Sequence, residues 1–436
     1  LDQGHFSKWQ GICVNLCFYI LTLLLLYRSA CLVIKDEVSA IIPMLCYGVS
    51  AGAVTTVLYI RMYMLMTFLC VLDVYLHILL LRKNGKRKGI LTAIFLTTVA
   101  GVLTQYYFLM FAFISSMIYC IMKVSEIRMC IYYGVTRMGA AVVSVLIFPS
   151  AVIQITTGSR GMAHISGILG NLTDLSKWTE RFCYYMSYID KQLFSGIGLQ
   201  IGIAAMTILL TVLLLVDRRK IILKKSILGG GNKTVLYLSF LSLLYLFFVI
   251  NYAPKVGKGF RYIVNIYPLI SLCVCCLLIN LIGKITKYRH HMLAVFSLCA
   301  VCVSIFSNKA ENIEYLHSSN IEVIDQLQKC NISANYFINK SDSQEYAFWM
   351  QYQNMIEKEN QQFLVTTYDR ILDMDDQDLN QTIHEKYDDG ILMYIATNYS
   401  LREAEQMVDS IIERTQLAEK SYIGTVDSER IFFCKD

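Results

Sequence analysis

The segment VLYIRMYMLM, residues 57–66, places a charged residue, Arg61, between two long apolar runs. Hydrophobic residues make up 56% of the 436 residues, a share well above that of an ordinary globular protein. They occur in runs of about 17 to 25, the length that a helix needs to cross about 30 Å of hydrocarbon. The sequence therefore predicts an integral membrane protein in which Arg61 lies in a turn between two spans.

The apolar runs are bounded by charged residues and predict about ten transmembrane helices. The predicted spans are residues 11–27, 40–59, 63–81, 89–104, 106–122, 138–156, 195–216, 234–252, 262–283 and 291–306. After Ser307 the composition changes, and charged residues occur throughout. We therefore predict an α-helical polytopic membrane domain, residues 1–307, followed by a soluble domain, residues 308–436.

The predicted soluble domain has the pattern of an α/β fold, because short β-rich runs alternate with helical segments. We expect strands at 334–338, 362–368, 391–397 and 430–435, and helices at 342–358 and 400–416. Such alternation favours a mostly parallel sheet covered by helices. Ser400 followed by Glu403 predicts a capping box. The segment LDMDDQDLN (372–380) indicates a solvated loop, with a cation site as the alternative.

The basic clusters predict the orientation, because short cytoplasmic loops retain Lys and Arg. RKNGKRK (82–88) is the strongest cluster, and we place it in the cytoplasm. Alternation of the spans then puts four further basic segments on the same side: the one with Arg28 and Lys35, 123–137, 217–225 and 283–291. The segments expected outside are the residues before Gln10, the Arg61 turn, the 157–194 loop, residues 251–260 and the whole soluble domain.

Two more features lie at the predicted outer face. LTQYYFLMF (103–111) interrupts an apolar run that is too long for one crossing, and it predicts two short helices joined by a tight turn at Thr104, Gln105, Tyr106 and Tyr107. NYAPKVGKGFRY (251–262) carries Lys255, Lys258 and Arg261 and no acidic residue. Each feature has a simpler explanation as interfacial anchoring or attraction to anionic lipid. Together with Arg61 they indicate one outer cavity that recognises an anion.

Three segments resemble GT-C membrane glycosyltransferases. YIRMYML (59–65) is similar to an eaRmYal segment, LTQYYFLMFAF (103–113) to an ltHyyflff hairpin, and FRYIVNIYPLI (260–270) to an RYlfpiyPli segment. Their order and approximate spacing also match, over about residues 5 to 285. The resemblance is to the bacterial branch related to protein O-mannosyltransferases and to the aminoarabinose transferases of lipid A.

The resemblance implies an inverting transferase in the bacterial plasma membrane. It would move a sugar from a polyprenyl-phosphate carrier to a glycan, lipid or protein acceptor at the outer face. The donor phosphate would lie against Arg61, Lys258 and Arg261, since cations stabilise the charge on a leaving phosphate. The substrate cavity would include four further residues: Tyr63, Gln105, Tyr106 and Tyr262. The bilayer is an expected partner, and nucleic acid is not.

The catalytic base of such enzymes is an Asp or Glu in the first external loop, and we expect it upstream of residue 1. The chain would thus be an N-terminally incomplete domain, and the base is not assigned to Asp2. Gln105 stands where many relatives have His, which leaves no metal ligand assigned there. No cofactor is assigned, and a divalent cation is an open alternative. The sequence contains no GxGxxG or Walker-type loop, in agreement with a lipid-linked donor.

Asp73 and His77 lie one helical turn apart inside the predicted 63–81 span. We interpret them as a buried hydrogen-bonded pair that also contacts a loop or a neighbouring helix, with a proton relay as the alternative. Three rival functions stay open for the whole chain. They are a lipid-linked polysaccharide polymerase or ligase, a secondary transporter and a noncatalytic membrane scaffold.

Overall fold

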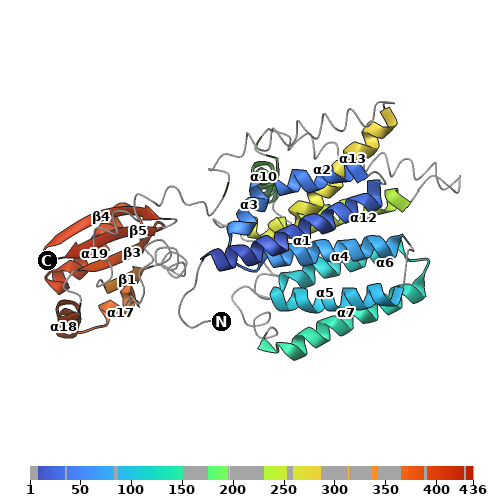
Figure 1. Cartoon of the computed structure of the whole chain (residues 1–436). Helices are drawn as coiled ribbons and strands as arrows, with labels where there is room; N and C mark the ends of the chain where they lie inside the picture. The colour runs from blue at the N-terminus through green and yellow to red at the C-terminus, as the bar shows by residue number, and fades with distance from the viewer. Residues whose placement is uncertain are drawn as a thin grey trace. The chain divides into compact units, whose positions relative to one another are not determined.

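The computed structural model describes twelve parts of the chain: residues 8–34, 37–82, 87–150, 175–194, 196, 230–252, 259–285, 313, 336–340, 365–386, 390–426 and 429–435. These residues belong to two compact units. One is helical and extends from Trp9 to Leu316, and the other contains the sheet and includes His317–Asp436 (Figure 1).

Five described helices are long and apolar enough to cross a membrane. They are α1 (Lys8–Ile34), α4 (Tyr63–Leu81), α5 (Arg87–Thr104), α7 (Ile127–Ile147) and α12 (Gly230–Tyr252). A sixth span is counted if α2 (Glu37–Gly48) and α3 (Ala51–Leu58), which are bent by 58°, form one crossing. The bend falls where Ser50 caps α3 by accepting a hydrogen bond from the Ala53 N–H.

The predicted break in the apolar run at 103–111 is confirmed. α5 ends at Thr104, and α6 (Tyr107–Met122) begins after a turn that contains Gln105. The two helices approach closely at this turn, since a Cβ atom on Gly101 would overlap the ring of Phe108. Glycine thus allows α6 to pack directly against the end of α5. Apart from Gly196, the predicted spans at 195–216 and 291–306 lie outside the described residues.

The predicted span at 138–156 was wrong at its start. The helix α7 begins at Ile127 and ends at Ile147, so most of the predicted cytoplasmic segment 123–137 is helical. The sequence placed Arg137 in a loop because a cation in a membrane helix is costly. In the structure Arg137 pairs with Asp73, which offsets that cost.

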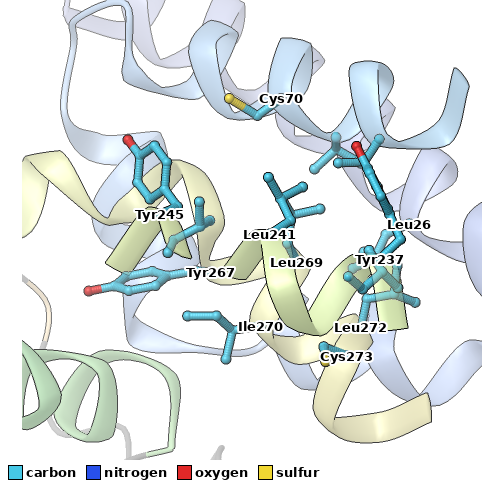
Figure 2. Packing of buried hydrophobic residues seen from close by; sticks show 14 of the residues in the cluster. Leu26, Cys70, Tyr237, Leu241, Tyr245, Tyr267, Leu269, Ile270, Leu272 and Cys273 are labelled. Atoms are coloured by element: carbon cyan, nitrogen blue, oxygen red, sulfur yellow. The ribbon is translucent and has the colours of Figure 1, made fainter. Parts of the chain in front are cut away.

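The predicted outer loop at 157–194 also contains a helix, α10 (Leu175–Leu193). Its buried hydrophobic residues, Tyr185, Ile189 and Leu193, follow one another at intervals of four and therefore lie on one face. They join the same core cluster as α4, α6, α12 and α13 (Tyr267–Ile285). Figure 2 shows part of this core, in which Tyr245 of α12 lies beside Tyr267 of α13 and Leu241 of α12 lies beside Leu269 of α13.

The second unit has a five-stranded sheet of order β2-β1-β3-β5-β4. The strands are β1 (Tyr336–Lys340), β2 (Val365–Thr367), β3 (Ile391–Ala396), β4 (Glu419–Val426) and β5 (Glu429–Lys435). β2, β1 and β3 are parallel, whereas β3, β5 and β4 are antiparallel. The sheet is therefore mixed, and the expected mostly parallel sheet holds for only one half of it. The sequence missed β4, an edge strand with many polar residues.

The described helices of this unit are α17 (Tyr368–Leu372), α18 (Asp376–Lys386) and α19 (Leu401–Thr415). The predicted capping box of α19 is confirmed: Ser400 accepts a hydrogen bond from the Glu403 N–H, and Glu403 accepts one from the Ser400 N–H. The expected solvated loop at 372–380 was wrong, because α18 begins inside it. Its first turn contains Asp376 and Asp378, which favour a helix N-terminus.

Candidate functional site

A cavity in the helical unit encloses about 220 Å³ of space between atoms, part of it open to solvent. Four separate segments form its wall: the start of α4, the α5–α6 turn, the middle of α12 and two short 3-10 helices, η1 (Gly259–Tyr262) and η2 (Val264–Ile266). The lining side chains are one guanidinium, two amides, four phenols and one thioether: Arg261, Gln105, Asn265, Tyr63, Tyr107, Tyr245, Tyr262 and Met66. The wall is thus rich in hydrogen-bond donors and carries a positive charge.

Arg261 supplies the charge of this cavity. Its side chain is only partly exposed, and its guanidinium lies 5.7 Å from the centroid of the Tyr262 ring. The Tyr63 side chain lies close to the guanidinium, whose Nε atom is buried without a hydrogen-bond partner among the described residues. Burial alone would lower the pKa of Arg261, whereas Tyr63 and Tyr262 raise it, and the net shift is upward. Arg261 is therefore a permanent cation, and its Nε–H group is available to donate a hydrogen bond to a ligand.

Two of the lining residues, Tyr245 and Asn265, form a hydrogen-bonded pair. The Tyr245 hydroxyl donates to the backbone carbonyl of Tyr262 over 3.2 Å, and the Asn265 amide donates to the Tyr245 oxygen over 2.9 Å. Both side chains are buried. These contacts tie η1 and η2 to α12, and they fix the backbone next to Arg261.

Four of the seven residues expected from the sequence lie together at this cavity: Tyr63, Gln105, Arg261 and Tyr262. Tyr106 does not line it; the Tyr106 ring stacks on that of Tyr107, 4.8 Å away, and Tyr107 lines the cavity instead. Arg61 is exposed and lies over the Tyr59 ring, 5.4 Å from its centroid. Lys258 lies outside the described residues.

Sequence reasoning missed four lining residues: Met66, Tyr107, Tyr245 and Asn265. Asn265 carried a usable signal, because it is a lone amide in the apolar segment 260–270. Tyr245 carried none, since a tyrosine in an apolar helix is common. The described lining residues include no carboxylate, and no group of three or more His, Cys, Asp or Glu residues within the described chain could hold a metal ion.

A second group of charged side chains is buried between α4, α5 and α7. Arg137 donates to the Asp73 carboxylate over 2.6 Å, to the Tyr133 hydroxyl over 2.9 Å and to Thr98. His77 contacts the Asp73 carbonyl over 2.7 Å and the Tyr133 hydroxyl over 2.8 Å. The expected buried pair of Asp73 and His77, with a partner on a neighbouring helix, is therefore confirmed.

Comparison with known proteins bears on the fold. No family model and no curated protein match the sequence. The chain is similar to the solved structure of ArnT from Cupriavidus metallidurans in the apo state, with a TM-score of 0.50 and 8% identity over 98% of this chain and 83% of that one. It is also similar to the same protein bound to undecaprenyl phosphate, with a TM-score of 0.48 and 8% identity over 98% of this chain and 84% of that one. The chain thus has the fold of ArnT, which confirms the GT-C resemblance of its sequence at the level of the fold.

Proposed function

We propose that this protein is a membrane glycosyltransferase that takes a sugar from a polyprenyl-phosphate carrier. The observation that carries the proposal is Arg261, a partly buried cation with an unpaired Nε donor at a cavity of a GT-C fold. A partly buried cation of this kind suits an anionic oxygen, because charge-assisted hydrogen bonds are stronger than neutral ones. A phosphate is the anion that the fold and the sequence resemblance both favour.

The lining residues suit the leaving-group half of the reaction. When an acceptor hydroxyl attacks the anomeric carbon, the bond from that carbon to the phosphate oxygen breaks, and the electron pair stays on the phosphate. Arg261 would stabilise this negative charge as it develops. The amide of Gln105 and the hydroxyl of Tyr63 would hydrogen-bond the phosphate or the sugar. The proton of the acceptor must pass to a base, and the described lining residues do not include a carboxylate.

The size of the cavity limits what enters it. The space between its atoms, about 220 Å³, includes open solvent, and the enclosed part has room for about one water molecule. The phosphate would therefore lie at the open side of the cavity, against Arg261, and the prenyl chain would stay in the bilayer. The acceptor would be a glycan, a lipid or a protein at the outer face, where the domain at 308–436 would contact it.

The proposal is tested by the affinity for polyprenyl phosphate of the full chain purified in detergent. We expect Arg261→Gln to weaken the binding of undecaprenyl phosphate about 10- to 150-fold, because one charge-assisted hydrogen bond contributes about 1.5–3 kcal/mol. Arg261→Lys should recover only part of the loss, since the planar guanidinium can form two parallel bonds and an ammonium cannot.

The matched control is Arg128→Gln. Arg128 is an exposed arginine on α7, and its replacement should leave the affinity unchanged. Equal affinity of the wild-type protein and Arg261→Gln would refute the proposal. An equal loss of affinity in Arg261→Gln and Arg128→Gln would show that the net positive charge of the protein attracts the lipid and that Arg261 forms no specific phosphate site.

A further inference from the structure

Tyr245 lines the same cavity as Arg261, but no described interaction joins it to the guanidinium. It sits in the middle of α12 and is 1% exposed. Its ring meets that of Phe111 edge to face, with the ring centroids 5.8 Å apart. Ring packing alone would be served equally well by phenylalanine, so the hydroxyl requires an explanation of its own.

The hydroxyl of Tyr245 connects two points of one short segment. It donates to the Tyr262 carbonyl in η1 over 3.2 Å and accepts from the Asn265 amide in η2 over 2.9 Å. The Asn265 amide also reaches Cys70 Sγ of α4, 3.7 Å away. Arg261 directly precedes Tyr262, so the bond to the carbonyl of Tyr262 holds the backbone that carries the guanidinium.

Short 3-10 helices need such support more than α-helices do. Their hydrogen bonds have poorer geometry, and runs longer than three or four residues are uncommon. η1 has four residues and η2 three. A buried side chain that hydrogen-bonds both turns therefore limits the positions available to Arg261. Functional groups act best when their own positions are locked by such supporting contacts.

We propose that Tyr245 is a positioning residue for Arg261, which its hydroxyl holds at the cavity through the Tyr262 carbonyl and the Asn265 amide. The inference rests on the proposed phosphate-binding function of Arg261. It assigns to Tyr245 no contact with the substrate, and its effect must therefore pass through Arg261.

The test is a double-mutant cycle of Tyr245→Phe and Arg261→Gln, with the binding of undecaprenyl phosphate to the full chain in detergent as the measurement. In the wild-type background we expect Tyr245→Phe to weaken binding about 5- to 10-fold, the effect of losing about one neutral hydrogen bond. In the Arg261→Gln background the same change should weaken binding less than about 2-fold, because residues that act as one unit are not additive.

Tyr237→Phe is the matched control. Tyr237 is a fully buried tyrosine on the same helix, and its hydroxyl has no hydrogen-bond partner among the described residues. Tyr237→Phe should leave the affinity for undecaprenyl phosphate unchanged. Hydrogen exchange provides a second measurement that needs no ligand: amides of residues 259–266 should exchange faster in Tyr245→Phe and at the wild-type rate in Tyr237→Phe.

The outcomes separate the two proposals. Equal weakening by Tyr245→Phe in both backgrounds, or unchanged exchange in 259–266, overturns the positioning role while Arg261 keeps its own. An affinity that Arg261→Gln does not change overturns the phosphate site itself, and the positioning role with it. Loss of folding in Tyr245→Phe, seen as a large drop in thermal stability that Tyr237→Phe does not share, also counts against a role limited to positioning.

Discussion

Replacement of Asp73 by Asn should strongly destabilise the helical unit, because it leaves the Arg137 guanidinium without a counter-ion between the helices. The Asp73 side chain is fully buried, and that of Arg137 is 8% exposed. At their separation of 2.6 Å and an effective dielectric constant of about 20, Coulomb's law gives an attraction of about 6 kcal/mol. Desolvation of both ions offsets part of this. We therefore expect Asp73→Asn to lower the free energy of unfolding by about 3–5 kcal/mol.

A double variant distinguishes an unpaired charge from a lost contact. Asp73→Asn with Arg137→Met removes both ions of this pair, so it should be more stable than Asp73→Asn alone. The matched control is Glu126→Gln, which removes the more exposed ion pairs of Glu126 with Lys123 and Arg87. Its expected effect is about 0–1 kcal/mol, as is usual for exposed pairs.

Unfolding of these variants can be followed through the buried cysteines of the helical unit. Cys70, Cys273 and Cys276 are buried free thiols, so a dye that fluoresces on reaction with thiols reports the loss of packing on heating in detergent. The reasoning would be refuted if the losses of stability caused by Asp73→Asn alone and by Arg137→Met alone added up to the loss in the double variant. It would also fail if Asp73→Asn cost no more than Glu126→Gln.

Two further predictions concern local structure. Gly101→Ala should destabilise the helical unit by about 1–3 kcal/mol, since its Cβ would overlap the Phe108 ring. Gly134→Ala, in open space on α7, should not destabilise it. The same thermal assay compares the two variants. The pKa of Glu403 lies below its ordinary value because its carboxylate accepts a hydrogen bond from the Ser400 backbone N–H and another from the Ser400 hydroxyl. The cap therefore stabilises α19 fully above the pKa of an unfolded glutamate, about 4.3, and this contribution is lost as the pH falls through the lower folded value. Hydrogen-exchange protection of the first turn of α19 should fall accordingly, and a Glu403→Gln variant that kept the same pH dependence would contradict the assignment.

The sequence predicted the membrane helices best where apolar runs end at charges or at a polar turn. The span at 63–81 has the bounds of α4, and the polar turn at Gln105 separates α5 from α6. It failed at Arg137, because the partner that makes the cation tolerable, Asp73, lies 64 residues away in the chain. It also failed at α10, whose polar face made an amphipathic helix look like a loop.

The candidate site was predictable only in part, for a similar reason. Arg261 and Gln105 stand out as polar residues at the ends of apolar runs, and the structure brings both to the cavity. The backbone geometry of the α5–α6 turn decides which of its residues faces the cavity. Tyr107 lines the cavity, whereas the sequence predicted Tyr106. Tyr245 acquires its role only through contact with η1 and η2, which periodicity cannot show.

Photocrosslinking tests most directly whether the cavity beside Arg261 holds a polyprenyl phosphate. Photoreactive benzoylphenylalanine would replace Tyr107, which lines the cavity, or Tyr132, which is 67% exposed on α7. The full chain would then be irradiated in liposomes that contain a radiolabelled polyprenyl-phosphate sugar. We expect crosslinking at position 107 that excess unlabelled polyprenyl phosphate and Arg261→Gln both suppress, and at position 132 only labelling that neither suppresses. Labelling at position 107 that survives the competitor and Arg261→Gln, or that merely equals the labelling at position 132, would contradict the phosphate site.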